Sequence, residues 1–238
     1  MNGNVDITFL KIKRAVEKNT ECFFCDIETE IEFRYLTNYL QELVMDSKAR
    51  DRIVESRGFC NNHFYKLLIE ASKPTTSDQH GVALIMQSII DQLIQDITLR
   101  KNTRKNNSKI LVGKNCPACS HVNEYIKMYF IKAAGLLASE EFKGLLQSSK
   151  GMCIPHFAIL TRMVESEEAY QTHILEFILE IERKNLERLK DELAEYIKRQ
   201  SYEFSETDRR ALADVVPRSV GKIAGIRGTM APKQTWEQ

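Results

Sequence analysis

The six cysteines of this chain form a pattern that occurs twice. Each time, a CxxC pair is followed by a CxxH motif, with 38 positions from Cys22 to Cys60 and 37 from Cys116 to Cys153. No cysteine lies outside the pattern. Two residues between ligands allow a tight turn in which both side chains reach one metal ion. The chain is therefore expected to fold so that turns far apart in the sequence meet.

The residues around these motifs indicate an internal duplication. The segment SRGFC at 56–60 aligns with SKGMC at 149–153. The offset between the halves is 94 at the CxxC pairs and 93 at the CxxH motifs, so the halves differ by one residue between motifs. Self-similarity at such a spacing predicts repeated structural units. We expect a first helical metal-binding repeat at 1–99, a basic linker at 100–110, a second repeat with a long helix at 111–203, and a flexible tail at 204–238.

Apolar residues recur at helical spacing through most of the chain, and no segment shows the strict alternation of a half-buried strand. The sequence therefore predicts an all-α fold, a duplicated helical unit with two metal-stapled repeats and a long C-terminal helix. Gly58 and Gly151 precede the ligand cysteines and indicate turns. The expected helices span 31–45, 64–71, 82–99, 122–137, 157–164 and 172–202.

Three cysteines and one histidine per half match the ligands of a closed zinc site. Three thiolates and one imidazole complete a tetrahedron around Zn²⁺ and leave no open position. A CxxC pair at a helix start would also benefit from free amides and the helix dipole, which favour thiolate. We therefore predict two Zn²⁺ sites, whose ligands are Cys22, Cys25, Cys60, His63, Cys116, Cys119, Cys153 and His156.

Several alternatives to this interpretation stay open. An iron–sulfur cluster could use the same thiolates, and the cysteines could instead be buried apolar residues or disulfides. His121 follows Cys119 by two positions and could substitute as a ligand, but its counterpart in the first half is Ile27. The CxxC of one half could also meet the CxxH of the other. The sequence does not decide between these pairings.

Composition and motifs exclude several classes of protein. The chain has 34 Lys and Arg against 33 Asp and Glu, a net charge of +1, so its overall charge does not attract nucleic acid. It contains no Walker loop, GxGxxG or GxSxG motif, and four protein ligands leave a metal no open position for catalysis. No apolar run reaches the length of a membrane helix, and the first ten residues do not resemble a signal peptide. We expect a cytoplasmic protein without membrane contact.

The paired halves resemble an uncharacterised family of bacterial and archaeal proteins, a domain of unknown function with two CxxC…GxCxxH halves. The segments SRGFCNNHF and SKGMCIPHF carry this resemblance, which covers roughly residues 21–164. The first half departs from the commoner CPxC form, with Phe23 where the second half has Pro117. The resemblance implies no activity, substrate or metal.

We therefore expect a non-enzymatic metal-binding helical protein that acts as an interaction or regulatory module. An iron–sulfur or thiol redox protein is the alternative, and nucleic-acid binding through the linker and tail is a weaker one. An unknown protein partner is expected. A homodimer is possible through the long helix, where Leu179, Leu186 and Leu193 repeat at heptad spacing.

Overall fold

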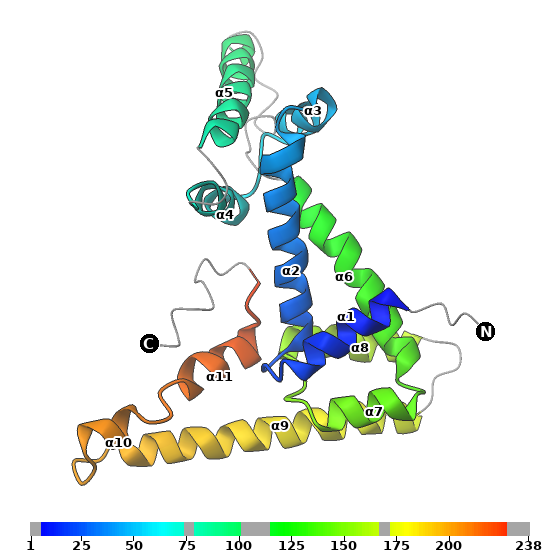
Figure 1. The fold of residues 1–238 in the computed structure, drawn as a ribbon, viewed down its shortest axis with the longest axis vertical. Coiled ribbons are helices and arrows are strands. Elements are labelled where there is room, and N and C mark those ends of the chain that lie inside the picture. The colour runs from blue at the N-terminus through cyan, green and yellow to red at the C-terminus, as the bar shows by residue number, and fades with distance from the viewer. Residues whose placement is uncertain (1–5, 74–78, 101–114, 167–171, 228–238) are drawn as a thin grey trace. The chain divides into compact units, whose positions relative to one another are not determined.

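A computed structural model describes residues 6–73, 79–100, 115–166 and 172–227 (Figure 1). Every regular element in this part of the chain is helical, so the all-α prediction is confirmed. None of the described helices is both long and apolar enough to span a membrane. The elements are α1 (Ile7–Glu17), α2 (Phe23–Asn38), the π-helical turn η1 (Tyr39–Leu43), α3 (Ser47–Glu55), α4 (Asn61–Ala71), α5 (His80–Arg100), α6 (Pro117–Leu136), α7 (Glu140–Gln147), α8 (Ile154–Ser166), α9 (Thr172–Arg199), α10 (Glu206–Arg210) and α11 (Val215–Ala224).

The predicted helices are present, and several begin earlier than the apolar pattern indicated. The helix predicted from residue 31 begins at Phe23, and the one predicted from residue 122 begins at Pro117. Both starts lie within a CxxC motif, where the cysteines interrupt the apolar and polar periodicity. Proline suits the first position of a helix because its missing N–H has no helical partner there. The basic linker lies almost entirely outside the described residues.

The structure differs from the expected tail after residue 204. Ser205 caps α10 by accepting a hydrogen bond from the Asp208 amide, and α11 follows. Two residues of α11, Val215 and Lys222, are fully buried. The basic and glycine-rich composition did not predict this helix. Its buried cation, Lys222, pairs with Glu182 of α9, and only the tertiary structure brings these two residues together.

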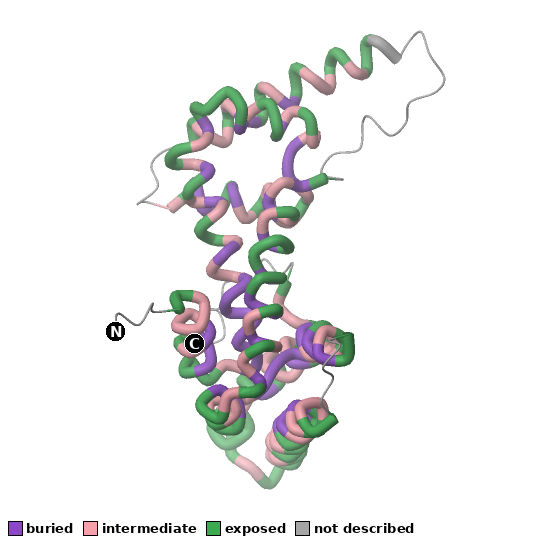
Figure 2. The backbone as a smooth tube through the Cα atoms, turned by 90° about the vertical axis from the view of Figure 1, so that its right-hand side faces the viewer, coloured by how far each residue is buried: buried purple, intermediate pink, exposed green. Residues whose placement is uncertain are grey.

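The chain forms two compact units, and each takes helices from both sequence repeats. Among the described residues, unit 1 holds 6–28 and 126–227, and unit 2 holds 29–125. Helix α2 therefore begins in unit 1 and ends in unit 2, whereas α6 begins in unit 2 and ends in unit 1. Along most helices, buried and exposed positions alternate within each turn (Figure 2). That pattern is typical of helices that each bury one face in a shared core.

The core of unit 1 is built around aromatic rings at the start of α2 and aliphatic side chains of α9. The rings of Phe24 and Phe130 stack with centroids 4.0 Å apart. Ile178 and Leu189 place the buried face of α9 against α8 and α11. Ile12 is fully buried on α1, which packs on α7.

The core of unit 2 lies between α3, α4, α5 and the later part of α2. Phe59 is fully buried and meets Tyr39 and Phe64 edge to face, with ring centroids 5.5 and 5.6 Å away. Ile85 and Ile89 supply the buried face of α5. The aromatic cluster holds the segment before Cys60 in a fixed place.

The duplication extends beyond the motif-bearing segments and includes the long helix α9. A Cβ built on Gly58 would lie 2.9 Å from Ile89 of α5, and one built on Gly151 would lie 2.5 Å from Glu182 of α9. Gly58 and Gly151 are 93 positions apart, and so are the residues that face them, Ile89 and Glu182. Helices α5 and α9 are therefore equivalent members of the two repeats, but an apolar side chain faces the glycine in one and a carboxylate in the other.

Replacing Gly58 by Ala is expected to destabilise the fold. The φ angle of Gly58 is +93°, and a Cβ there would lie 2.3 Å from the ring of Phe64. Strain at such a position costs about 1–3 kcal/mol, and the clash adds to it. Gly144→Ala is the matched control, because nothing lies within 4 Å of its Cβ and it sits inside α7. Urea unfolding should show a lower midpoint for Gly58→Ala and an unchanged or higher one for Gly144→Ala. Equal midpoints would contradict this account of the turn.

Candidate metal centres

The structure gathers the eight predicted ligands into two groups. Site I contains Cys22, Cys25, Cys153 and His156, and site II contains Cys60, His63, Cys116 and Cys119. Within each group the ligand atoms all lie within 4.8 Å of one another. Each site therefore combines the CxxC of one repeat with the CxxH of the other. The pairing that the sequence left open is the exchanged one, and each site lies within a single unit.

All four motifs occupy the first turn of a helix. Cys22 and Cys116 directly precede α2 and α6, and Cys60 and Cys153 directly precede α4 and α8. In each case the carbonyl of the leading cysteine accepts a hydrogen bond from the amide four residues later. Each site therefore joins the N-termini of two helices. The positive end of each helix dipole favours thiolate at these positions.

The distances between ligand atoms in site I fit one small ion. His156 Nδ1 lies 3.3 Å from Cys22 Sγ, 3.5 Å from Cys25 Sγ and 3.2 Å from Cys153 Sγ. Cys25 Sγ and Cys153 Sγ are 3.6 Å apart. The same ring nitrogen thus faces all three sulfurs.

Site II has nearly the same geometry. His63 Nδ1 lies 3.1 Å from Cys60 Sγ, 3.3 Å from Cys116 Sγ and 3.4 Å from Cys119 Sγ. Cys60 Sγ and Cys119 Sγ are 3.7 Å apart. A tetrahedron of sulfurs about 2.3 Å from a central Zn²⁺ has edges of about 3.8 Å, so both sites match a single tetrahedral ion. A [4Fe–4S] cluster binds each ligand to a separate iron at its outer corners and requires wider spacing.

A carboxylate lies close to the second nitrogen of each histidine. His63 Nε2 lies 2.8 Å from Glu32 Oε1, and His156 Nε2 lies 3.4 Å from Glu28 Oε2. A histidine that binds a metal through one nitrogen usually donates its other N–H to such a group, which fixes its tautomer and orientation. Glu28 and Glu32 both belong to α2, four positions apart, and the corresponding residues of α6 are Val122 and Ile126.

Sequence reasoning missed these two glutamates. They lie outside the apolar stripe that predicted their helix. Glutamate is also common on exposed helical surfaces, so neither residue stood out as a partner of a histidine. Their position one and two turns after Cys25 was the available signal, because Glu28 lies three positions after a ligand of site I. The fold was needed to bring Glu32 to His63, a ligand from another helix.

Without a bound metal ion, the electrostatics of each site favour one cysteine thiolate paired with a protonated histidine. Burial opposes charge on His63, but hydrogen bonds with Cys116 and Glu32 outweigh it and raise the pKa of His63 to about 10. Burial likewise opposes the Cys116 thiolate, yet the hydrogen bond with His63 lowers the pKa of Cys116 to about 6. Burial also opposes the Cys22 thiolate, and hydrogen bonds from its neighbours lower its pKa well below the ordinary value. The hydrogen bond with Cys153 raises the pKa of the Cys25 thiol, and burial raises the pKa of the Cys119 thiol to about 12. A divalent cation would therefore meet one prepared thiolate in each site and would displace the protons of Cys25 and Cys119.

His121 belongs to neither group. Its ring packs between Tyr35 and Tyr125, with centroid distances of 4.6 and 4.3 Å. The residue that the sequence offered as a substitute ligand therefore has an aromatic packing role.

Site I has an additional buried ion pair. The ammonium of Lys222, fully buried on α11, lies 2.7 Å from Glu182 Oε1 of α9. Lys222 also donates to the carbonyl of Lys150, and the amide of Met152 donates to Glu182 Oε2. The pair therefore fixes the turn that leads into Cys153. Lys222 Nζ also lies 3.4 Å from the carbonyl of Glu21, the residue before Cys22.

Comparison with protein families identifies the wider group. A family of unknown function, DUF6062, matches residues 4–229. The chain belongs to DUF6062. No curated protein and no solved structure matches it. The DUF6062 match extends well past the motif-bearing segment at 21–164 and includes Glu182 and Lys222, so α9 and α11 fall within the matched region.

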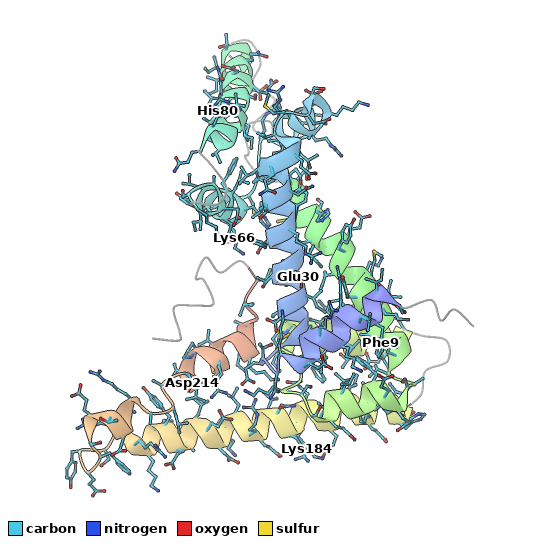
Figure 3. All side chains as sticks on the ribbon, in the orientation of Figure 1. Phe9, Glu30, Lys66, His80, Lys184 and Asp214 are labelled. Carbon is cyan, nitrogen blue, oxygen red and sulfur yellow. The ribbon has the colours of Figure 1, made fainter. Side chains whose placement is uncertain are left out.

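The carboxylates behind the histidines provide a test of metal binding. Glu32→Gln is expected to weaken zinc binding at site II by roughly 10–100-fold, because the amide is a poorer acceptor for the histidine N–H. Glu28→Gln should have the same effect at site I. Glu30→Gln is the matched control on the same helix, because Glu30 forms an exposed ion pair with Arg34 and lies near neither histidine. Glu30 is labelled on α2 in Figure 3. Competition with a zinc chelator measures the affinities. Unchanged affinity in both test variants would argue against this role.

Proposed function

We propose that this member of DUF6062 is a non-enzymatic helical protein in which each site holds one structural Zn²⁺. The single observation that carries the proposal is the spacing of the ligand atoms. In each site the three distances from the histidine nitrogen to the sulfurs and one distance between two sulfurs lie between 3.1 and 3.7 Å, and all four ligand atoms lie within 4.8 Å of one another, which fits a tetrahedron around one ion. Four protein ligands complete that tetrahedron, which leaves no position for substrate or an activated water.

Zinc in these sites would stabilise the exchanged arrangement of the two repeats. In site I it would join the start of α2 to the start of α8, and in site II the start of α6 to the start of α4. Binding free energy at a structural zinc site adds directly to folding free energy.

An interaction role is supported by an exposed apolar face on α5. Met86, Ile90, Ile94 and Ile97 are 37%, 48%, 56% and 54% exposed and recur at helical spacing. The equivalent positions of α9 include Arg183 and Glu187, which form an ion pair at the surface. Ile90 and Ile94 therefore occupy positions that carry charged side chains in the other repeat, whereas Met86 matches Leu179, which is also exposed. Exposed apolar patches of this kind are typical of protein interaction surfaces.

Elemental analysis of anaerobically purified, untagged protein tests the proposal, together with an absorbance spectrum of the same sample. Two zinc per chain and no visible absorbance is the expected result. Iron with sulfide and a band at roughly 400 nm would replace zinc with an iron–sulfur or redox function. A folded protein without metal, with six titratable thiols, would overturn the proposal and its redox alternative together.

A further inference from the structure

The two sites share one ligand set but differ in how far the protein encloses them. In site I, Cys22, Cys25, Cys153 and His156 are 5%, 3%, 0% and 6% exposed. In site II, Cys116 and His63 are buried, but Cys60 and Cys119 are only half-buried. Their counterparts in the repeat are Cys153 and Cys25, which are both buried. The difference therefore lies in what surrounds each site.

Helix α11 and the ion pair beneath it account for the enclosure of site I. Gly225, at the end of α11, approaches the ligands so closely that a Cβ on it would lie 3.5 Å from Cys153 Sγ. Lys222 and Glu182 hold the turn before Cys153, as described above. Arg218 of α11 adds an ion pair with Glu21, the residue before Cys22.

Among the residues that the structure describes, site II has no equivalent ion pair. The position that matches Glu182 is Ile89, which cannot accept the amide hydrogen bond or pair with a lysine. Arg57 instead holds the turn before Cys60 through an ion pair with Asp96 of α5, and Arg57 is only 16% exposed there. That pair fixes the turn, but Cys60 and Cys119 stay partly exposed.

We propose that site II is a peroxide-responsive thiolate centre, in which Cys60 and Cys119 form a disulfide and release the zinc, while site I keeps its zinc. The inference rests on the proposed function, because it requires zinc in both sites. The two sulfurs are already 3.7 Å apart. Site I has a comparable pair, Cys25 and Cys153, at 3.6 Å, so accessibility and not sulfur spacing distinguishes the sites.

The chemistry uses only the two thiolates and hydrogen peroxide. One thiolate attacks the peroxide, the O–O bond breaks, and a sulfenic acid and hydroxide form. The second thiolate attacks that sulfur, an S–S bond forms, and a second hydroxide leaves. The two sulfurs lose two electrons to the peroxide oxygens, and two protons convert both hydroxides to water. The zinc keeps its charge and dissociates, because it has lost two of four ligands.

The test uses the full-length protein loaded with two zinc ions and treated with excess hydrogen peroxide. A chromophoric zinc chelator follows zinc release, and peptide mass spectrometry locates the disulfide. One zinc per chain is expected to leave at least roughly tenfold faster than the second, because reaction follows thiolate access. The cross-linked peptide should join Cys60 to Cys119, and dithiothreitol with added zinc should restore the starting state.

Three results would overturn the inference. These are release of both zinc ions at the same rate, a first disulfide within site I, and retention of both ions under excess peroxide. In all three the starting protein contains two zinc ions, so the proposed function would stand. A starting protein without zinc would overturn both. Cys153→Ser keeps only site II and should release its zinc rapidly, whereas Cys60→Ser keeps only site I and should retain it. If either variant fails to fold, disulfide mapping in the wild type decides the question.

Discussion

Replacing Cys153 by Ser is expected to remove one zinc per chain and to lower the melting temperature by about 10 °C or more. Structural zinc contributes about 10–16 kcal/mol of binding free energy in small peptides, and the loss of one thiolate forfeits a large part of it. For a chain of this size, each 1 kcal/mol shifts melting by about 2–4 °C. Cys153 is fully buried, so no water can replace the missing ligand without opening the site.

Metal content and thermal unfolding have to be measured on the same sample. His121→Ala is the matched control, because this histidine lies two positions after Cys119 and belongs to neither ligand group. It should retain two zinc ions and melt within a few degrees of the wild type. A Cys153→Ser protein with one zinc and unchanged melting would show that site I binds metal without stabilising the fold.

The second large effect is expected when the ion pair behind site I is broken. Lys222→Met leaves the Glu182 carboxylate buried without its cation, and the carbonyl of Lys150 loses a donor. Removal of one partner from a buried pair costs about 3–5 kcal/mol. The zinc affinity of site I should fall as well, because the turn before Cys153 is no longer held.

Two further variants separate this effect from the loss of any lysine. Lys184→Met is the matched control on α9, since Lys184 lies on the exposed side of that helix in a surface ion pair (Figure 3). It should change stability by less than about 1 kcal/mol. The double variant Glu182→Leu with Lys222→Met should recover much of the loss, because an apolar pair can replace a buried ion pair. Ile89 at the matched position indicates that the fold accepts an apolar side chain there.

Urea unfolding and chelator competition at both sites measure these outcomes. A Lys222→Met protein with wild-type stability would falsify the assigned role of the pair. Weakening of site II to the same extent as site I would show instead that the substitution disturbs the whole chain.

The sequence selected the candidate ligands but not how they combine. Two CxxC and two CxxH motifs selected all eight residues, because a pair of ligands three positions apart is a local feature of one helical turn. Whether Cys22 meets His63 or His156 depends on which helices pack together. Contacts between segments more than fifty positions apart are set by the whole core, and both pairings satisfy the same local pattern.

The residues that support the ligands show the same limit. Glu32 and Glu182 are ordinary glutamates by sequence, and Glu182 even interrupts an apolar line of α9. Each acquires its role from a group on another helix, His63 for one and Lys222 for the other. A buried charge is stable only with such a partner. The same limit applies to the predicted flexible tail, in which the structure places α11. Its residue Lys222 is buried opposite Glu182, and the sequence does not show that pairing.

The sequence by itself determined the helical class, the duplication and the chemistry of the ligands, since periodicity, repetition and residue type are local properties of the chain. Tertiary structure alone decided that the repeats exchange their motifs and that one site is enclosed while the other is partly open. Those properties depend on packing between α8, α9 and α11 in unit 1 and on Ile89 at the corresponding place in unit 2. Two sites with the same ligands can therefore differ in access, because the surrounding helices, and not the ligands, exclude solvent.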